Sequence, residues 1–122
     1  MEKYIDVMKR TIELSVTCLE GLEHIKVKLN EGRFEETIQL MNDVVTAFSK
    51  MESSIQPIFH TLPSNEIQPL THSLINAFEN AVTAYEQGQA GKVKEIFQFT
   101  LLPAYKKWKV EVEKVFHPYL IS

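Results

Sequence analysis

The chain contains very little of several residue types that mark whole classes of protein. Of its 122 residues, one is cysteine, four are glycine, and two, Arg10 and Arg33, are arginine. The single cysteine, Cys18, excludes an intramolecular disulfide. The scarcity of arginine leaves few of the planar guanidinium groups that bind phosphate or carboxylate through two contacts at once. A disulfide-stapled fold is therefore excluded, and a polyanion-binding protein is disfavoured.

Long apolar runs and a strong charge of either sign are also missing. The formal net charge is −3, from 13 basic and 16 acidic residues, so nucleic acid is not an expected partner. No apolar run approaches the roughly 18 residues that a membrane-spanning helix needs. Residues 1–6 lack a basic region followed by an apolar core, so no secretory signal is expected. These absences predict a cytoplasmic protein without an integral membrane segment.

Two similar segments organise the rest of the chain. Residues 30–34 and 86–90 each place acidic or amide residues before a glycine, between two long helical patterns. Gly32 and Gly88 suit the left-handed residue that commonly follows a helix. Each segment therefore predicts an αα-hairpin. Together the hairpins predict one all-α domain over residues 1–122, an antiparallel four-helix bundle.

Apolar residues recur every three or four positions and give the extent of the four helices. We expect these helices over about residues 4–30, 34–56, 64–88 and 90–117. Pro57 and Pro118 are expected to end the second and fourth, because proline lacks a backbone donor. Pro103 falls inside the last pattern, whose apolar face resumes in phase beyond it, so a helix kinked at Pro103 is expected. The predicted core contains Phe48, Leu74, Phe78, Phe97, Leu101 and Trp108.

The first helix is expected to turn one apolar face to that core. Gly21 lies inside this helix, where glycine costs about 1 kcal/mol relative to alanine. Cys18 is interpreted as a small buried residue, because no activating base or positive helix end lies close to it. The predicted buried face comprises Ile5, Met8, Ile12, Leu19, Leu22 and Leu29.

Histidines are the residues closest to a chemical site. Glu20 and His24 lie one helical turn apart, but the Glu-x-x-His spacing of two-metal bundles is absent. His60 and His117 lie near expected helix ends, where a cationic ring suits the terminal carbonyls. We therefore predict no catalytic, metal-binding or cofactor-binding residue. An enzyme or ligand-binding bundle with a polar pocket near His24 or His72 is kept as an alternative.

Lysines cluster in residues 106–109 and again at Lys114. Trp108 is in phase with Leu101 and Tyr105, which turns its ring inward and leaves the lysines in solvent. This structural interpretation is favoured over contact with an anionic surface.

Two short motifs carry a resemblance to known proteins. Residues 32–40 read Gly-Arg-Phe-Glu-Glu-Thr-Ile-Gln-Leu, and residues 101–108 read Leu-Leu-Pro-Ala-Tyr-Lys-Lys-Trp. The chain thereby resembles small, uncharacterised helical proteins of Firmicutes, which have a Gly-x-Tyr/Phe-Glu-Glu-x-Ile-x-Leu turn and a late Leu-x-Pro-x-x-x-x-Trp segment. It departs from them at Phe99 and Thr100, where an acidic residue commonly precedes the leucines. The resemblance implies a bacterial helical fold with a cytoplasmic accessory role and supplies no catalytic residues.

These patterns favour a non-catalytic protein-interaction module, such as a small adaptor or chaperone that binds a partner helix between its own helices. An apolar tail beyond Pro118 is expected either to dock on the bundle or to meet a partner, and its residues Tyr119, Leu120 and Ile121 are the expected partner-binding residues. A structural homodimer, in which leftover apolar stripes cover each other, is an alternative from a different class.

Overall fold

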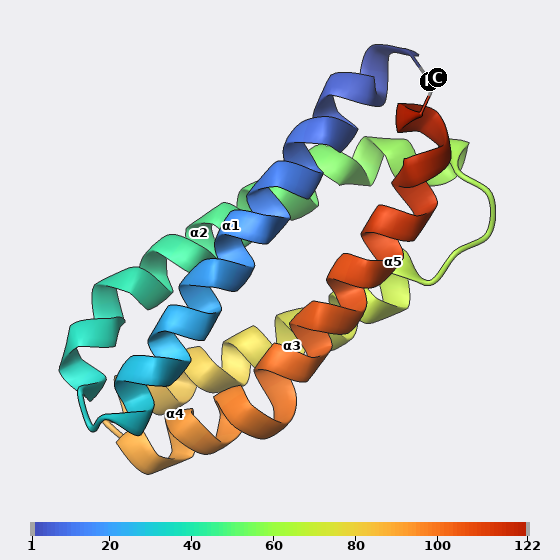
Figure 1. Cartoon of the computed structure of the whole chain (residues 1–122). Coiled ribbons are helices and arrows are strands. Elements are labelled where there is room, and N and C mark those ends of the chain that lie inside the picture. The colour runs from blue at the N-terminus through green and yellow to red at the C-terminus, as the bar shows by residue number, and fades with distance from the viewer. Residues whose placement is uncertain (1, 122) are drawn as a thin grey trace.

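A computed structural model describes residues 2–121, which fold into four long antiparallel rods (Figure 1). The first hairpin consists of α1 (Ile5–Asn30) and α2 (Ile38–Ile55). The second consists of α3 (Ile67–Glu86) and a bent rod made of α4 (Ala90–Ile96) and α5 (Leu102–Leu120). The predicted all-α four-helix bundle is confirmed. Short 3₁₀ segments flank the rods at η1 (Glu2–Tyr4), η2 (Phe34–Thr37) and η3 (Gln56–Thr61).

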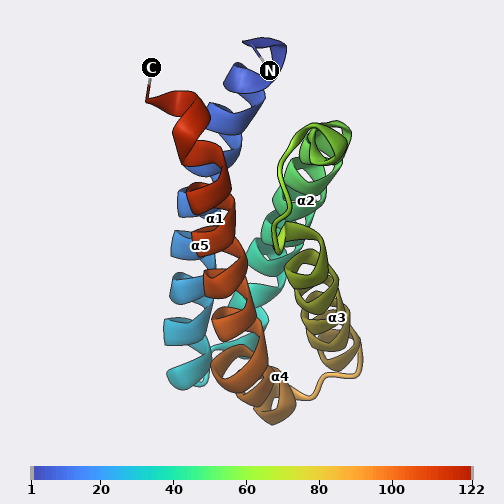
Figure 2. The same ribbon diagram turned by 90° about the vertical axis from the view of Figure 1, so that its right-hand side faces the viewer.

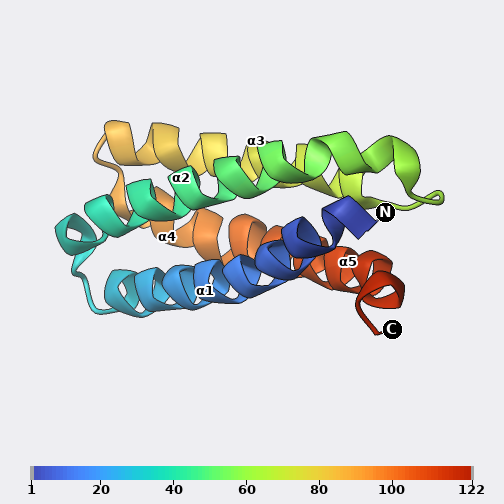
Figure 3. The same cartoon turned by 90° about the horizontal axis from the view of Figure 1, so that it is seen from above.

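The rods lie in two layers, α2 with α3 and α1 with α5 (Figure 3). The layers diverge toward the end of the bundle where both chain termini lie (Figure 2). α1 packs closely against α2 and α5, and α3 packs against α5, whereas α2 and α3 make few contacts with each other. The side of the bundle between α2 and α3 is therefore the least closed.

Both glycine turns have the geometry that the sequence predicts. Gly32 has a φ of +75° and Gly88 a φ of +65°. After α1, the Arg33 N–H donates to the Lys28 carbonyl at 2.9 Å. The Gly32 N–H donates to the carbonyl of residue 29 at 3.1 Å, and the turn after α3 repeats this pair of bonds. Both helices thus end in a Schellman motif, which favours a left-handed glycine.

The last rod bends over one π-helical turn, η4 (Phe97–Leu101) (Figure 1). The Leu102 N–H donates to the Phe97 carbonyl, five residues earlier. Pro103, which has no N–H to offer the Phe99 carbonyl, stands in the first turn of α5, where a missing donor is tolerated. The predicted kink is therefore taken up by the turn just before Pro103. Phe97 within this turn and Trp108 beyond it are both buried.

Pro57 and Pro118 behave differently. α2 stops at Ile55 and Pro57 lies at the start of η3, close to the predicted end. The prediction that Pro118 ends the last helix is wrong, because α5 continues through Pro118 to Leu120. Proline removes one helical hydrogen bond there, and packing of Tyr119 and Leu120 against the core offsets that loss. These two residues form the last turn of α5 rather than a free tail.

Every predicted core residue is buried, with at most 5% of its surface exposed. The predicted face of α1 is right in part, because Ile5, Ile12 and Leu19 are only half-buried. Small side chains occupy the centre of the true face, where the bulky Tyr105 of α5 lies beside Ser15 and Cys18. The buried residues of α1 are Met8, Thr11, Ser15, Cys18, Leu22, Ile25 and Leu29.

Two aromatic residues of α5 make buried hydrogen bonds to other rods. The Tyr105 hydroxyl donates to the Ser15 carbonyl of α1 at 2.8 Å. The Trp108 indole N–H donates to the Thr71 hydroxyl of α3 at 2.9 Å, and that hydroxyl donates to the Ile67 carbonyl at 2.7 Å. Within residues 2–121, no buried side-chain nitrogen or oxygen lacks a hydrogen-bond partner. α5 is therefore bonded to α1 in its own layer and to α3 in the other layer.

Gly21 has a packing reason to interrupt the α1 pattern. A Cβ atom at this position would lie 3.1 Å from Cγ2 of Val44 on α2. Glycine therefore lowers the helix propensity of α1 but allows α1 and α2 to approach each other closely.

Candidate functional site

The histidines lie on outward faces of the bundle. His24, His60, His72 and His117 are all exposed. Neither His24 nor His72 lines the two grooves described below. Within the described residues, no three histidine, cysteine, aspartate or glutamate side chains gather closely enough to hold a metal ion. The alternative of a polar pocket around His24 or His72 therefore has no converging side chains to support it.

Cys18 is buried, as predicted, and lies beside Tyr105. Burial raises the pKa of the Cys18 thiol, and a hydrogen bond with Tyr105 opposes part of that rise. Burial also raises the pKa of the Tyr105 hydroxyl. Because the thiolate is the reactive form of cysteine, this environment suits packing and disfavours a nucleophile.

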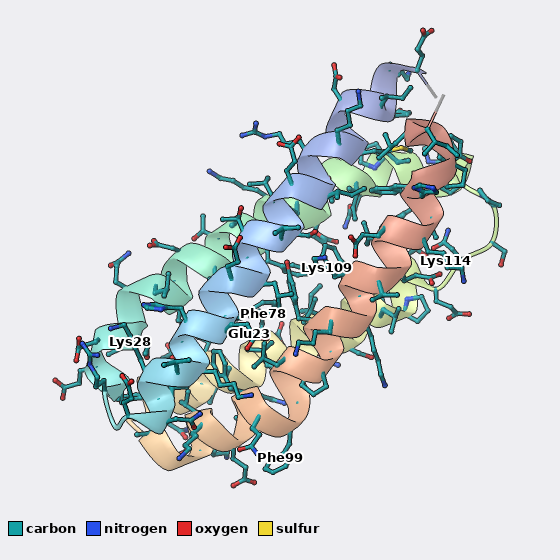
Figure 4. All side chains as sticks on the ribbon, in the orientation of Figure 1. Glu23, Lys28, Phe78, Phe99, Lys109 and Lys114 are labelled. Carbon is teal, nitrogen blue, oxygen red and sulfur yellow. The ribbon has the colours of Figure 1, made fainter. Side chains whose placement is uncertain are left out.

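Lys106, Lys107 and Lys114 are exposed on the outer side of α5, as predicted, whereas Lys109 is half-buried. Trp108 is fully buried. Lys106 pairs with Glu23 of α1 at 3.2 Å, and Lys109 pairs with Glu113 at 3.0 Å. Figure 4 labels Lys109 and Glu23 among the side chains of α5 and α1. Pairing with acidic neighbours spreads the positive charge, so the segment does not form an isolated cationic patch.

An open groove with a volume of about 510 Å³ runs between α2 and α3. Its floor is the ring pair of Phe48 and Phe78, whose centroids lie 5.1 Å apart; Figure 4 labels Phe78 on α3. Its walls include the half-buried chains of Val45, Ile75 and Val82. We define the α2–α3 groove as Val45, Phe48, Ser49, Glu52, Ile75, Phe78, Glu79, Val82 and Thr83.

The charged side chains of the α2–α3 groove are both acidic. Glu52 comes from α2 and Glu79 from α3, so each wall contributes one carboxylate. Glu52 accepts a hydrogen bond from Gln56 at 2.6 Å. Among residues 2–121, neither carboxylate has a lysine or arginine as an ion-pair partner. The groove therefore combines an apolar floor with negative charge that no internal cation neutralises.

A second open groove, of about 680 Å³, lies on the other side of α2, against the N-terminal half of α1. Its charged side chains are both basic, Arg10 from α1 and Lys50 from α2. Neither forms an ion pair within the part of the chain that the structure describes. It shares Val45 and Ser49 with the first groove. We define the α1–α2 groove as Val7, Arg10, Thr11, Leu14, Val45, Thr46, Ser49, Lys50, Met51, Ser53 and Ser54.

The predicted partner-binding residues lie elsewhere, at the end of the bundle that carries the termini (Figure 1). Tyr119 and Leu120 are half-buried against the core, and Ile121 is 62% exposed. None of the three lines either groove. Their role in binding a partner stays a prediction.

Sequence reasoning did not locate the two grooves, although a signal for one was present. Ile75 and Val82 each follow a buried residue of α3, so the apolar stripe of that helix is wider than its contact with α5 requires. The sequence does not show which neighbouring helix α3 packs against. Only the packing of the rods shows that α2 leaves this extra width uncovered.

The architecture thus defines a helical bundle with an open groove on each side of its second rod. The chain belongs to the family described as a domain of unknown function (DUF8042), whose model matches residues 6–111. No curated protein and no solved structure matches the chain. The family region contains every residue of both grooves and ends before Tyr119.

The family membership bears out the expected likeness to domains without an assigned function. Origin in Firmicutes and the two quoted motifs stay predictions. Among residues 2–121, no helix combines the length and the apolar character needed to cross a membrane.

Proposed function

We propose that this chain is a non-catalytic protein-interaction module that binds an amphipathic partner helix in the α2–α3 groove. One observation carries the proposal: a groove floored by Phe48 and Phe78 lies open between two helices that make few contacts with each other. An open groove walled by half-buried apolar side chains and bordered by polar residues suits the apolar face of a partner helix.

The length of the groove suits a helix. Its lining spans eight residues along α2, from Val45 to Glu52, and nine along α3, from Ile75 to Thr83. At about 1.5 Å per residue, the walls are roughly 10–12 Å long. Two turns of a partner helix fit that length, with apolar anchors at positions i, i+3 or i+4, and i+7.

The charge of the groove indicates what flanks those anchors. Glu52 and Glu79 stand on opposite walls without an internal cation. Lysine or arginine on either side of the partner's apolar stripe would complement them and raise the rate of association. A small adaptor or chaperone, as expected from the sequence, would use such a surface.

We place the binding surface in the groove rather than in the tail because Tyr119 and Leu120 already pack against the core. Binding through the tail would require their displacement. The α2–α3 groove is open without any such rearrangement.

Binding can be tested with a labelled helical peptide of about five turns, with leucines three and four residues apart and lysines on both flanks. We expect fluorescence anisotropy to show binding to the wild type, with Val82→Ser weakening it about tenfold. Val27→Ser is the matched control, because Val27 is 52% exposed on α1, outside the groove. Circular dichroism checks that both variants fold.

A second matched pair tests the charge. Glu79→Lys should weaken the lysine-flanked peptide, whereas Glu95→Lys, at an exposed residue of α4, should not. Equal affinity for all four variants, or no binding to the wild type, would contradict the proposed function.

A further inference from the structure

We infer that the face of the chain that carries both grooves binds a second copy, in a two-fold dimer that sets the basic residues bordering the α1–α2 groove of each copy against the acidic residues bordering the α2–α3 groove of the other. The inference rests on the proposed function, because it uses the same groove and names its partner.

Opposite charge on the two grooves is the first reason. Arg10 and Lys50 line one groove, and Glu52 and Glu79 line the other. All four lack ion-pair partners within residues 2–121. Each groove therefore has the flanking charges that the other requires, with apolar surface between them.

The position of these charges along α2 is the second reason. The two grooves share Val45 and Ser49, so they lie side by side on one face of the molecule. Lys50 and Glu52 are two residues apart in α2, about 3 Å along the helix axis. Lys50 of the basic groove and Glu52 of the acidic groove therefore lie at nearly the same level, to either side of Ser49.

Symmetry then decides the orientation of the two copies. A two-fold axis parallel to α2 places the basic side of one copy opposite the acidic side of the other. It leaves each charge at the same height along the helix axis, so each basic groove faces an acidic groove. A two-fold axis perpendicular to α2 would instead place the basic side of one copy opposite the basic side of the other, so like charges would meet. The dimer therefore has its two α2 helices parallel, in contact at Val45 and Ser49.

A second copy satisfies more of this surface than a single partner helix does. A lysine-flanked helix neutralises Glu52 and Glu79 but leaves Arg10 and Lys50 without acidic partners. A second copy supplies both signs of charge, and does so twice, because the contact is symmetric.

Sedimentation equilibrium tests the inference across a wide range of concentrations. We expect the mass to rise from the monomer value of 14.1 kDa toward twice that value. Lys50→Glu and Glu79→Lys should each weaken self-association about tenfold or more, because each reverses two symmetric contacts. Arg10→Glu is a further variant of the basic flank, in case Lys50→Glu does not fold by circular dichroism.

Mixing the two variants is the decisive step. In a heterodimer of Lys50→Glu with Glu79→Lys, one contact joins the two introduced charges and the other joins the two native ones, so both are complementary. An equimolar mixture should therefore regain the wild-type affinity. A mixture that stays as weak as the separate variants overturns the two-fold arrangement, and a wild-type mass fixed at 14.1 kDa overturns self-association.

The same variants separate this inference from the proposed function. Lys50→Glu leaves the α2–α3 groove intact, so it should bind the lysine-flanked peptide at least as well as the wild type does. Peptide binding by a chain that never associates would reject the second copy and retain the interaction module. If the chain neither binds the peptide nor associates with itself, both the second copy and the interaction module are rejected.

Discussion

The interior around α5 and the two sides of α2 are built in opposite ways. Around α5, large aromatic rings are fully buried and their polar atoms are satisfied by Ser15 and Thr71. Along α2, Val45 stays half-exposed and the neighbouring charges, such as Lys50 and Glu79, lack ion-pair partners among residues 2–121. The difference indicates that α5 stabilises the fold and that α2 is available for binding.

Phe48 connects the two regions. Its ring meets Trp108 edge-on, with centroids 5.2 Å apart, and also packs on Phe78 in the groove floor. The proposed binding surface therefore rests directly on the buried aromatic cluster. Substitutions in the walls of the groove should spare that cluster, whereas substitutions in its floor should not.

The largest expected difference between the regions is in stability. Trp108→Ala should lower the free energy of unfolding by about 3–5 kcal/mol, because it removes a fully buried ring and leaves a cavity. Val82→Ser, in the half-exposed wall of the α2–α3 groove, should cost less than about 1.5 kcal/mol. Urea denaturation measures both, and similar losses would contradict the division between the regions.

A smaller effect tests whether the polar contacts of the interior matter. Thr71→Val keeps the shape of the side chain but leaves the Trp108 N–H without its acceptor, which should cost about 1–3 kcal/mol. Thr71→Ser keeps the hydroxyl and serves as the control, with thermal denaturation as the measurement. If valine and serine were equivalent, the buried hydrogen bond would have no role in stability.

The end of the bundle with the glycine turns gives a more modest effect. Tyr85 stacks on Phe34 with ring centroids 5.1 Å apart, and its hydroxyl shares a hydrogen bond of 2.8 Å with Thr37. Tyr85→Phe should lower stability by about 0.5–1.5 kcal/mol, because the hydrogen bond is lost and the stacking remains. Tyr119→Phe, which loses no hydrogen bond to the described residues, should change stability less in the same denaturation experiment.

The weakest effect is a dependence of stability on alkaline pH. Burial raises the pKa of the Cys18 thiol above its ordinary value of 9.0, so near that pH the unfolded chain loses this proton before the folded chain does. The contribution to stability is complete below the unfolded pKa and is lost as pH rises toward the folded value.

Denaturation at several pH values checks this effect. Stability should fall from about pH 8 upward, and Cys18→Ala should make that fall shallower. The pKa of Tyr105 is also raised by burial, so part of the fall should persist in the variant. An unchanged slope in Cys18→Ala would show that the thiol does not take part.

The helices, turns and core could be predicted because each depends on local chemistry. Gly32 and Gly88 mark two helix ends, and the phase of Trp108 with Leu101 places both in the core. The role of Thr71 could not be read in this way, because it depends on an indole 37 residues further along the chain. The end of α5 was misjudged because proline chemistry was weighed without the packing of Leu120.

The grooves lay beyond sequence reasoning for a related reason. Periodicity shows which residues are apolar, but it does not show how far apart two helices stand. Val45 and Ile75 belong to apolar stripes that a tighter α2–α3 contact would have covered. The tail was favoured instead because Tyr119, Leu120 and Ile121 form the most evident apolar cluster beyond a proline.

The central claim is that the surface on either side of α2 is where this module binds. Amide NMR of the labelled chain, titrated with the lysine-flanked peptide, tests it most directly. We predict that the largest chemical-shift changes fall in residues 45–52 and 75–83. Changes centred on residues 119–121, or no changes at saturating peptide, would contradict the claim.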